Sequence, residues 1–189
     1  METALSVSVL RASERTATPW RNGGGITREI AVSPPGAGIA DFDWRISMAE
    51  VSAAGPFSRF DGIDRVLTVL AGTLRLTVQG QPALLDAHSA PYPFPGDTEC
   101  WGEPQGGPVA DLNVMVRRGR YTGRVWRKLA GDFSASADTW LFVALEAGTV
   151  TVNQATHQLH RRDAILGQRA RFETTTSGPG LVIELEAIP

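Results

Sequence analysis

The feature that most constrains the fold is an alternation of apolar residues with polar or small ones, at a period of two. It is clearest in residues 5–10, 44–49, 66–70, 74–78 and 111–116. Successive side chains of a β-strand point to opposite faces, so this period is typical of strands with one buried face. The continuous apolar run at 140–145 fits a strand buried on both faces, whereas the best helical candidate, 132–139, is short and reads equally well as a loop. The sequence therefore predicts an all-β protein.

Turn-forming residues support this prediction, because 20 glycines and 12 prolines are spread over the whole chain. Between residues 66–70 and 74–78 stands Gly72, which can take the positive φ that a tight turn requires. We expect these two segments to form a β-hairpin around it.

The two halves of the chain share a pattern. Residues 71–74 (AGTL) recur as 147–150 (AGTV), and each copy is followed by a Gly-Pro pair and a closing strand. Two copies of one β-unit predict two related β-barrels, with residues 117–128 as a basic, solvated connector. A chain of 189 residues is long enough for two such small barrels.

Composition excludes several classes of protein. A formal net charge of −2 argues against binding nucleic acid through the overall field. No run approaches the roughly 18 apolar residues of a membrane helix, and the N-terminus lacks the basic and apolar segments of a secretory signal. We expect a cytoplasmic protein that binds neither nucleic acid nor a membrane.

Metal and nucleophile sites are not predicted. Two of the three histidines, His157 and His160, stand three apart in an expected strand and so point to opposite faces. The single cysteine, Cys100, has no histidine near it in the sequence to activate it. Ser58 lacks the Gly-x-Ser-x-Gly setting of a hydrolase nucleophile. We therefore expect no metal, no cofactor and no covalent catalysis.

The most unusual stretch is residues 18–30 (TPWRNGGGITREI). Three successive glycines let backbone amides converge on an anion, or let another segment approach closely. The spacing of a phosphate-binding loop is missing, and from the glycines alone a flexible turn before a strand is the simpler interpretation.

Two further features point to a polar site. Arg65 opens an apolar strand, where an unpaired charge is costly unless it meets a carboxylate or a ligand. In the strand 111–116, alternation places Asp111, Asn113 and Met115 on one face. That face either meets solvent or lines a polar cavity inside a barrel.

Together these stretches resemble the HutD/Ves family of bacterial proteins. The resemblance rests on residues 19–30 (PWRNGGGITREI), 44–49 (WRISMA), 55–58 (GPFS), 62–65 (GIDR), 94–97 (FPGD) and 111–115 (DLNVM). It implies a double cupin of the RmlC-like jelly-roll type. Residues 1–120 would form the first cupin unit, with the ligand pocket, and residues 121–189 a structural second unit. The resemblance also favours a functional role for the glycine run.

The resemblance does not extend to the metal chemistry of the wider cupin superfamily. Metal-dependent cupins carry a His-x-His motif with a further glutamate and histidine near the first hairpin. The corresponding region here, residues 62–67 (GIDRVL), has no histidine. Members of the family are encoded with histidine-utilisation genes or are linked to stress responses, and their activity is poorly defined.

The leading hypothesis is a metal-independent binder of a small anionic metabolite, acting as a sensor or modulator. For a member that serves histidine catabolism, urocanate, formiminoglutamate and formylglutamate are candidate ligands, because arginines pair with carboxylates. The candidate ligand-binding residues are Trp20, Asn22, Arg28, Arg45, Arg65, Phe94, Asp97, Asp111 and Asn113.

Two alternatives stay open. One is a metal-free isomerase or hydrolase acting on a sugar or amino-acid derivative, with Glu29, Asp97 or Asp111 as general acid or base. The other is a protein-interaction module. A homodimer is compatible with all three hypotheses.

Overall fold

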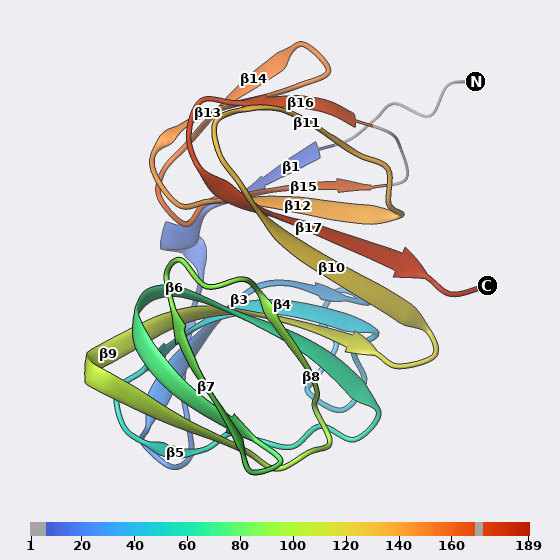
Figure 1. Ribbon diagram of the computed structural model, residues 1–189. Helices are drawn as coiled ribbons and strands as arrows, with labels where there is room; N and C mark the ends of the chain where they lie inside the picture. The colour runs from blue at the N-terminus through green and yellow to red at the C-terminus, as the bar shows by residue number, and fades with distance from the viewer. Residues whose placement is uncertain (1–6, 169–171) are drawn as a thin grey trace. The chain divides into compact units, whose positions relative to one another are not determined.

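The computed structural model describes residues 7–168 and 172–189, which form β-strands and one short 3-10 turn, η1 (Ala12–Glu14). The prediction of an all-β protein is confirmed (Figure 1). The chain divides into two compact units. The first unit is Thr16–Tyr121, and the second comprises residues 7–15 with Thr122–Pro189. We expected residues 7–15 in the same unit as the rest of residues 1–120. They belong to the second unit instead, because β1 (Val7–Leu10) pairs with β15 (Ala164–Gln168).

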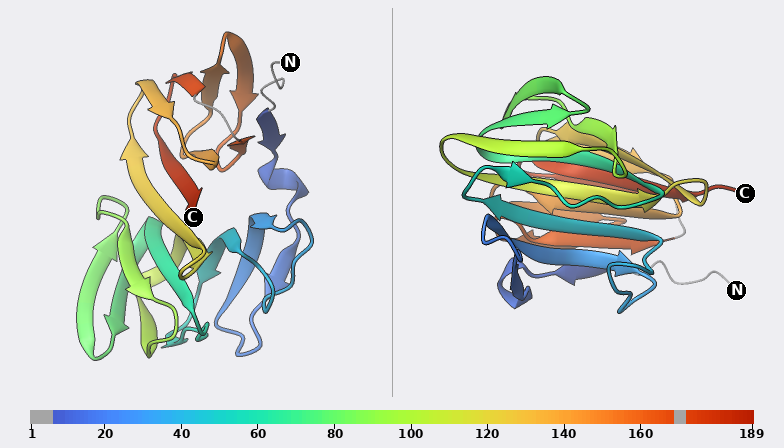
Figure 2. Two further views of the ribbon diagram at one scale, coloured as in Figure 1. Left: turned by 90° about the vertical axis from the view of Figure 1, so that its right-hand side faces the viewer. Right: turned by 90° about the horizontal axis from the view of Figure 1, so that it is seen from below.

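The first unit is built on one sheet in the order β2-β3-β4-β9-β6-β7, with β5 paired to β9 and β8 paired to β6. Its strands are β2 (Ala17–Pro19), β3 (Gly25–Ser33), β4 (Trp44–Val51), β5 (Gly55–Pro56), β6 (Ile63–Val78), β7 (Gln81–Asp86), β8 (Tyr92–Pro95) and β9 (Cys100–Arg117). The long strands β6 and β9 curve through the unit, as Figures 1 and 2 show from three sides.

The hairpin expected around Gly72 is wrong, because β6 continues through this position. The register between β6 and β9 shifts on either side of Ala71, and Gly72 has a φ of +80°. A Cβ at Gly72 would lie 2.6 Å from the carbonyl oxygen of Pro108 on β9. The glycine therefore permits an irregular, bent strand instead of a chain reversal.

This bend folds the sheet over a hydrophobic core. Both halves of β6 contribute to one cluster, with Leu67 and Val69 before the bend and Leu74 and Leu76 after it. The sheet nevertheless stays open, and among the described strands no sheet closes into a barrel. The two closed barrels expected from the sequence are therefore not confirmed.

The second unit contains two sheets, in the orders β1-β15-β12-β17-β10 and β11-β16-β13-β14. Its further strands are β10 (Tyr121–Lys128), β11 (Gly131–Ala135), β12 (Thr139–Ala144), β13 (Gly148–Val152), β14 (Ala155–Leu159), β16 (Phe172–Thr176) and β17 (Gly180–Ala187). The expected connector 117–128 is thus largely the edge strand β10. The helical alternative for 132–139 is also wrong, because β11 and β12 cover most of it.

The repeat between the two halves is visible in the strand pairing. In the second unit β12 pairs with β15 and β17, and β13 pairs with β14 and β16. In the first unit the early half of β6 pairs with β8 and the late half of β9. The later half of β6 pairs with β7 and the early half of β9. The AGT segments therefore stand at equivalent places, the bend of β6 and the start of β13.

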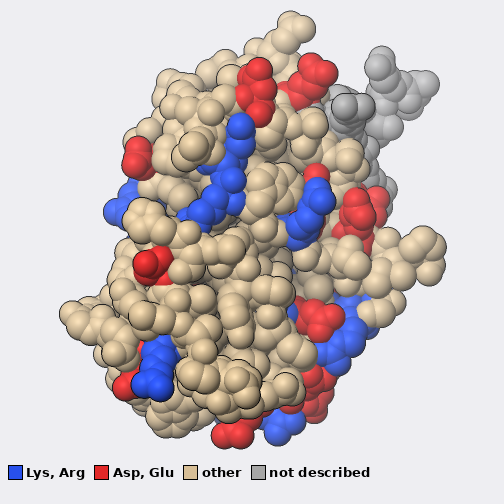
Figure 3. Space-filling model, in the orientation of Figure 1, with Lys and Arg blue, Asp and Glu red and all other residues tan. Residues whose placement is uncertain are grey.

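On the face drawn in Figure 3, acidic and basic side chains lie interspersed, without a broad area of one sign. Within residues 7–168 and 172–189, no helical segment has the length and apolar character needed to cross a lipid bilayer.

Candidate functional site

One face of the first unit's sheet gathers polar side chains, and we call it the polar face. Cα partners in neighbouring strands place Arg65 and Arg45 on either side of Met115, and the next two rows along β9 contain Asn113 and Asp111. Because every second residue of a strand shares a face, these side chains lie on the same side as Ser47 of β4. The polar face is defined by Arg45, Ser47, Arg65, Asp111 and Asn113.

The polar face is turned away from solvent. Arg65 is 5% exposed, and Ser47 and Asp111 are 2% exposed. It continues into the core residues Leu67 and Val69, which share its side of β6. Asp111 is therefore turned away from solvent and Asn113 is partly buried, whereas a polar cavity at this face stays a prediction.

Aromatic rings surround the guanidinium of Arg65. Its Cζ lies 4.9 Å from the ring centroid of Phe94, 5.5 Å from that of Phe60 and 5.8 Å from that of Phe57. The negative faces of such rings attract a cation and offset part of the free-energy cost of burying it. Phe94 is also the Cα partner of Arg65 in the β6–β8 ladder. This packing holds the charged group in an apolar setting.

The hydrogen bonds of Arg65 are few and long. Its Nε donates to Asn113 Oδ1 at 3.5 Å, and its Nη1 donates to the carbonyl oxygen of Ser58 at 3.3 Å. A guanidinium has five N–H donors, and none of the ion pairs among the described residues includes Arg65. Burial lowers the pKa of Arg65, and the ionised forms of Cys100 and Asp111 would act in the opposite direction. The group therefore presents unused donors without a partner carboxylate.

Asp111 is the second unusual group of the polar face. Its Oδ2 is buried and has no hydrogen-bond partner among the described residues. Burial raises the pKa of Asp111 to about 7, although the charge of Arg65 acts in the opposite direction. Burial likewise raises the pKa of the nearby Cys100 thiol to about 11, so this thiol is neutral at pH 7. Asp111 is consequently divided between its charged and neutral forms near neutrality.

Arg45 and Glu29 lie at the solvent-exposed side of the polar face. Arg45 Nε donates to Glu29 Oε2 at 2.7 Å, and the two side chains are 16% and 42% exposed. This pair engages the Glu29 carboxylate in an ion pair. Glu29 is one of the three carboxylates considered as general acid or base. Its ion pair with Arg45 gives it a structural role.

The glycine run forms a tight connection between β2 and β3. The amide of Trp20 donates to the carbonyl oxygen of Gly25 at 2.9 Å, and the amide of Gly24 donates to Asn22 Oδ1 at 3.0 Å. A Cβ at Gly25 would lie 2.5 Å from the carbonyl oxygen of Glu50 and 3.2 Å from Trp20 Cδ2. Gly25 therefore allows the close approach of another segment, which was one of the two predicted roles of the glycine run.

This connection fixes Trp20 beside the rings around Arg65. Its indole Nε1 donates to Thr27 Oγ1 at 2.7 Å. Its ring meets Phe57 edge-on, with centroids 5.7 Å apart, and Phe57 in turn contacts Arg65. Phe57 thus lies between Trp20 and the guanidinium of Arg65, and Trp20 supports this ring from the other side.

Three of the predicted site residues lie elsewhere. Asn22 is exposed and its side chain accepts a hydrogen bond within its own turn. Arg28 is on the opposite face of β3, paired with Glu50 at 3.0 Å. Asp97 pairs with Arg118 at 2.8 Å, and this hydrogen bond lowers its pKa to about 2. The structure thus brings together Arg45, Arg65, Phe94, Asp111 and Asn113, with Trp20 nearby.

Sequence reasoning missed four residues of this site. Phe57, Phe60 and the carbonyl of Ser58 come from the segment between β5 and β6, which has no alternation to indicate a direction. Ser47, in contrast, belongs to the alternating segment 44–49, and strand pairing alone would have placed it beside Asn113.

The polar face does not suit a divalent cation. Metal sites need several converging nitrogen, sulfur or carboxylate ligands. On the polar face the cationic guanidinium of Arg65 lies between the potential ligands. Asn113 Oδ1 already accepts a hydrogen bond from Arg65 Nε. In the part of the chain that the structure describes, no three His, Cys, Asp or Glu side chains are grouped to hold a metal.

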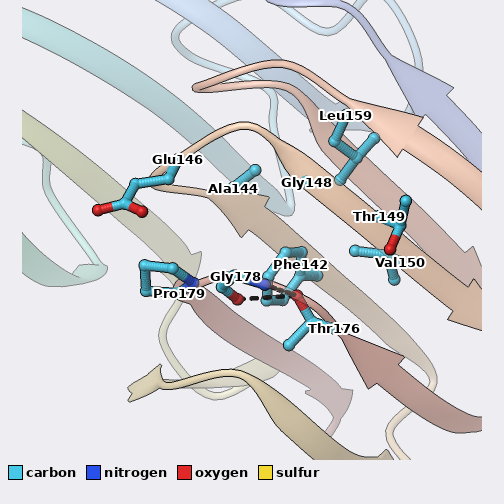
Figure 4. Close-up of a pocket in the computed structure, with 10 residues that line it drawn as sticks. All are labelled: Phe142, Ala144, Glu146, Gly148, Thr149, Val150, Leu159, Thr176, Gly178 and Pro179. Atoms are coloured by element: carbon cyan, nitrogen blue, oxygen red, sulfur yellow. Dashed lines mark hydrogen bonds between the residues drawn. The ribbon is translucent and has the colours of Figure 1, made fainter.

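The core of the second unit holds a buried tryptophan, Trp140 of β12. Trp140 has Cα partners in β15 and β17. Its ring takes the space that a side chain at Gly167 would need, and Phe142 does the same at Gly180. A shallow hollow of about 160 Å³, open solvent included, is lined by residues such as Thr149 (Figure 4). The buried aromatic rings thus fill the interior of the second unit.

Comparison with known proteins decides the family. The HutD family model matches residues 12–183. The chain belongs to the HutD family. A protein of Pseudomonas putida named for the 3′ region of hutC is 34% identical over 157 residues, 82% of each chain. Protein Ves of Citrobacter koseri is 40% identical over 110 residues, 56% of each chain.

Solved structures agree with this assignment. HutD from Pseudomonas fluorescens SBW25 has a TM-score of 0.86 and 31% identity, covering 97% of this chain and 100% of its own. A cupin 2 conserved barrel domain protein from Leptotrichia buccalis has a TM-score of 0.60 over 99% of both chains, at 8% identity. At that identity the likeness shows the fold alone. The HutD family member described here therefore has a cupin-like fold.

Proposed function

We propose that this HutD family protein binds a small carboxylate through Arg65, without a metal, and acts as a sensor or modulator. The observation that carries the proposal is the buried guanidinium with no carboxylate partner among the described residues. Burying an unpaired charge is costly. A ligand carboxylate would accept two parallel N–H bonds from the planar guanidinium and offset that cost.

The surrounding residues suit this role. Asn113 accepts from Nε and the Ser58 carbonyl accepts from Nη1, which fixes the plane of the guanidinium and leaves its other N–H groups for a ligand. Phe94 provides an apolar wall, and the nearby Arg45–Glu29 pair gives the solvent side polar character. Binding sites of small molecules combine such apolar walls with a few placed polar groups.

We further infer that the two units are cupin units of which only the first retains a ligand site. The shared order of strand pairing supports two copies, and the aromatic core of Trp140 and Phe142 supports the absence of a ligand site in the second unit. The name of the Pseudomonas putida relative refers to hutC, which favours a ligand from histidine utilisation. Urocanate, formiminoglutamate and formylglutamate all carry the carboxylate that Arg65 would bind.

Isothermal titration calorimetry with these three compounds, and with sugar nucleotides for contrast, tests the proposal. We expect at least one carboxylate to bind, and Arg65→Met to weaken it about 30-fold or more. Arg28→Met is the matched control, because Arg28 lies on the opposite face and pairs with Glu50. Equal affinities of wild type and Arg65→Met would overturn the site. Absence of binding by every compound would instead favour a protein partner.

One observation favours a second function, a metal-free enzyme. Burial brings the pKa of Asp111 to about 7, which is the range that suits a general acid or base at neutral pH. Incubation of each bound carboxylate with the protein, followed by NMR, tests for turnover. Turnover lost in Asp111→Asn supports the enzyme, whereas unchanged ligand after prolonged incubation supports the sensor.

A further inference from the structure

We propose that Asp111 is a second ligand contact, whose carboxylate accepts a hydrogen bond from an N–H group of the bound molecule. This inference rests on the proposed carboxylate site at Arg65. Together the two groups would select a ligand with a carboxylate at one end and an N–H donor at the other, such as an imidazole or an N-acyl amide.

The separation of the two groups along the sheet supports a ligand with two functional ends. Arg65 is the Cα partner of Met115, but its side chain reaches along β9, because its Nε lies 3.5 Å from Asn113 Oδ1. Asp111 stands two residues beyond Asn113 on the same face. Two residues of a strand rise by roughly 7 Å. A molecule of a few bonds can span that interval.

Within residues 7–168 and 172–189, no donor reaches Asp111 Oδ2. This oxygen is buried, and the Cα partners of Asp111 are the apolar Val69 of β6 and Ala49 of β4. A buried acceptor without a donor costs free energy, so such a group marks a place where a ligand donor is missing.

The charged and titratable groups that face Asp111 determine its protonation. The charge that acts on Asp111 is that of Arg65 from β6. Cys100 from the early half of β9 acts on Arg65, and the Arg45–Glu29 pair lies two rows away along the sheet. Desolvation outweighs the attraction of Arg65, so the pKa of Asp111 rises to about 7. An N–H donor on the ligand would stabilise the charged form and lower that pKa again. Binding near pH 7 would then release a fraction of a proton.

A matched pair of ligands tests this contact. Urocanate has an imidazole N–H, and 3-(2-furyl)acrylate has the same acrylate with a ring oxygen and no N–H. We expect wild type to bind urocanate about tenfold or more tightly than the furan compound. Asp111→Leu should remove this preference, while Asp111→Asn should retain part of it because its amide oxygen still accepts. Arg65→Met should weaken both ligands.

Calorimetry of urocanate binding at pH 7 in phosphate and in Tris gives an independent readout, because these buffers differ in ionisation enthalpy. Proton release in wild type that is absent in Asp111→Asn supports the proposal. Proton uptake, or equal affinity of wild type for the two ligands, overturns it. If wild type binds both ligands equally and Arg65→Met weakens both, only the Asp111 contact fails. If Arg65→Met changes neither affinity, the carboxylate site itself fails.

Discussion

The guanidinium carbon of Arg65 lies 4.9 Å from the centroid of the Phe94 ring, and the two residues are Cα partners on β6 and β8. An aromatic face attracts a cation, but it does not accept N–H bonds with the strength of a carboxylate. The fold thus holds the guanidinium of Arg65 in place while leaving most of its donors unused. Such a compromise is characteristic of binding sites, where stability is given up for function.

A first prediction follows for stability without ligand. Replacing Arg65 by Met removes a buried charge and keeps a side chain of similar length, so we expect the variant to be as stable as wild type or up to about 2 kcal/mol more stable. Urea denaturation of the ligand-free proteins measures this difference. A loss of more than about 2 kcal/mol would mean that Arg65 is a structural residue, and would argue against a binding role.

A second prediction concerns Gly96, in the turn that follows β8. A Cβ there would lie 2.8 Å from the carbonyl oxygen of Ile63 and 3.1 Å from Arg65 Cδ. Gly96→Ala should therefore destabilise the protein by about 1–3 kcal/mol and, by displacing Arg65, weaken carboxylate binding. Thermal denaturation and calorimetry check the two effects. Gly36→Ala serves as the control for stability, since nothing lies within 4 Å of a Cβ there and only its positive φ adds strain.

The fold could be predicted from the sequence to the extent that side-chain alternation reports strand faces. Alternation in 111–116 placed Asp111 and Asn113 on one face, and β9 has that arrangement. Gly72 was misinterpreted because a positive φ serves a tight turn and a strand irregularity equally well. Only the pairing of both halves of β6 with β9 distinguishes the two, and that pairing is a long-range property.

The candidate site was predictable in part for a related reason. Arg65 stood out because a charge opens an apolar strand, and it is indeed buried. Asp97 and Arg28 were included because nothing local revealed their partners. Those partners, Arg118 and Glu50, are 21 and 22 residues away in the chain. Ion pairs of this separation depend on how strands meet, which periodicity does not determine.

A third prediction separates Asp97 from the binding site. Its hydrogen bonds to Arg118 lower its pKa to about 2, so the stability it contributes is present above its unfolded pKa and is lost only as pH falls through about 2. Because this ion pair is exposed, Asp97→Asn should change the melting temperature by less than about 3 °C. Carboxylate affinity should stay within about twofold of wild type. A large loss of carboxylate affinity in Asp97→Asn would mean that Asp97 belongs to the binding site after all.

The last prediction concerns Asp163, which ties the residues after β1 to the second unit. Asp163 is 2% exposed and accepts hydrogen bonds from Arg11 Nη1 at 2.7 Å, the Ala12 amide at 2.7 Å and the His160 amide at 3.0 Å. Burial alone would raise its pKa, but these bonds outweigh burial and lower it. We expect Asp163→Asn to cost about 1–3 kcal/mol at pH 7, because a charged acceptor of several bonds is lost.

The pH dependence of this cost follows from the direction of the pKa shift. A carboxyl whose pKa is lower in the folded than in the unfolded protein stabilises the fold above the unfolded pKa, near 3.9, and loses that effect as pH falls through the folded pKa. The difference between wild type and Asp163→Asn in urea denaturation should therefore be largest at pH 7 and shrink below about pH 4. The exposed Asp61→Asn is the control and should show little difference at either pH. A cost of Asp163→Asn that does not change between pH 7 and pH 3 would mean that shape, and not charge, makes Asp163 stabilising.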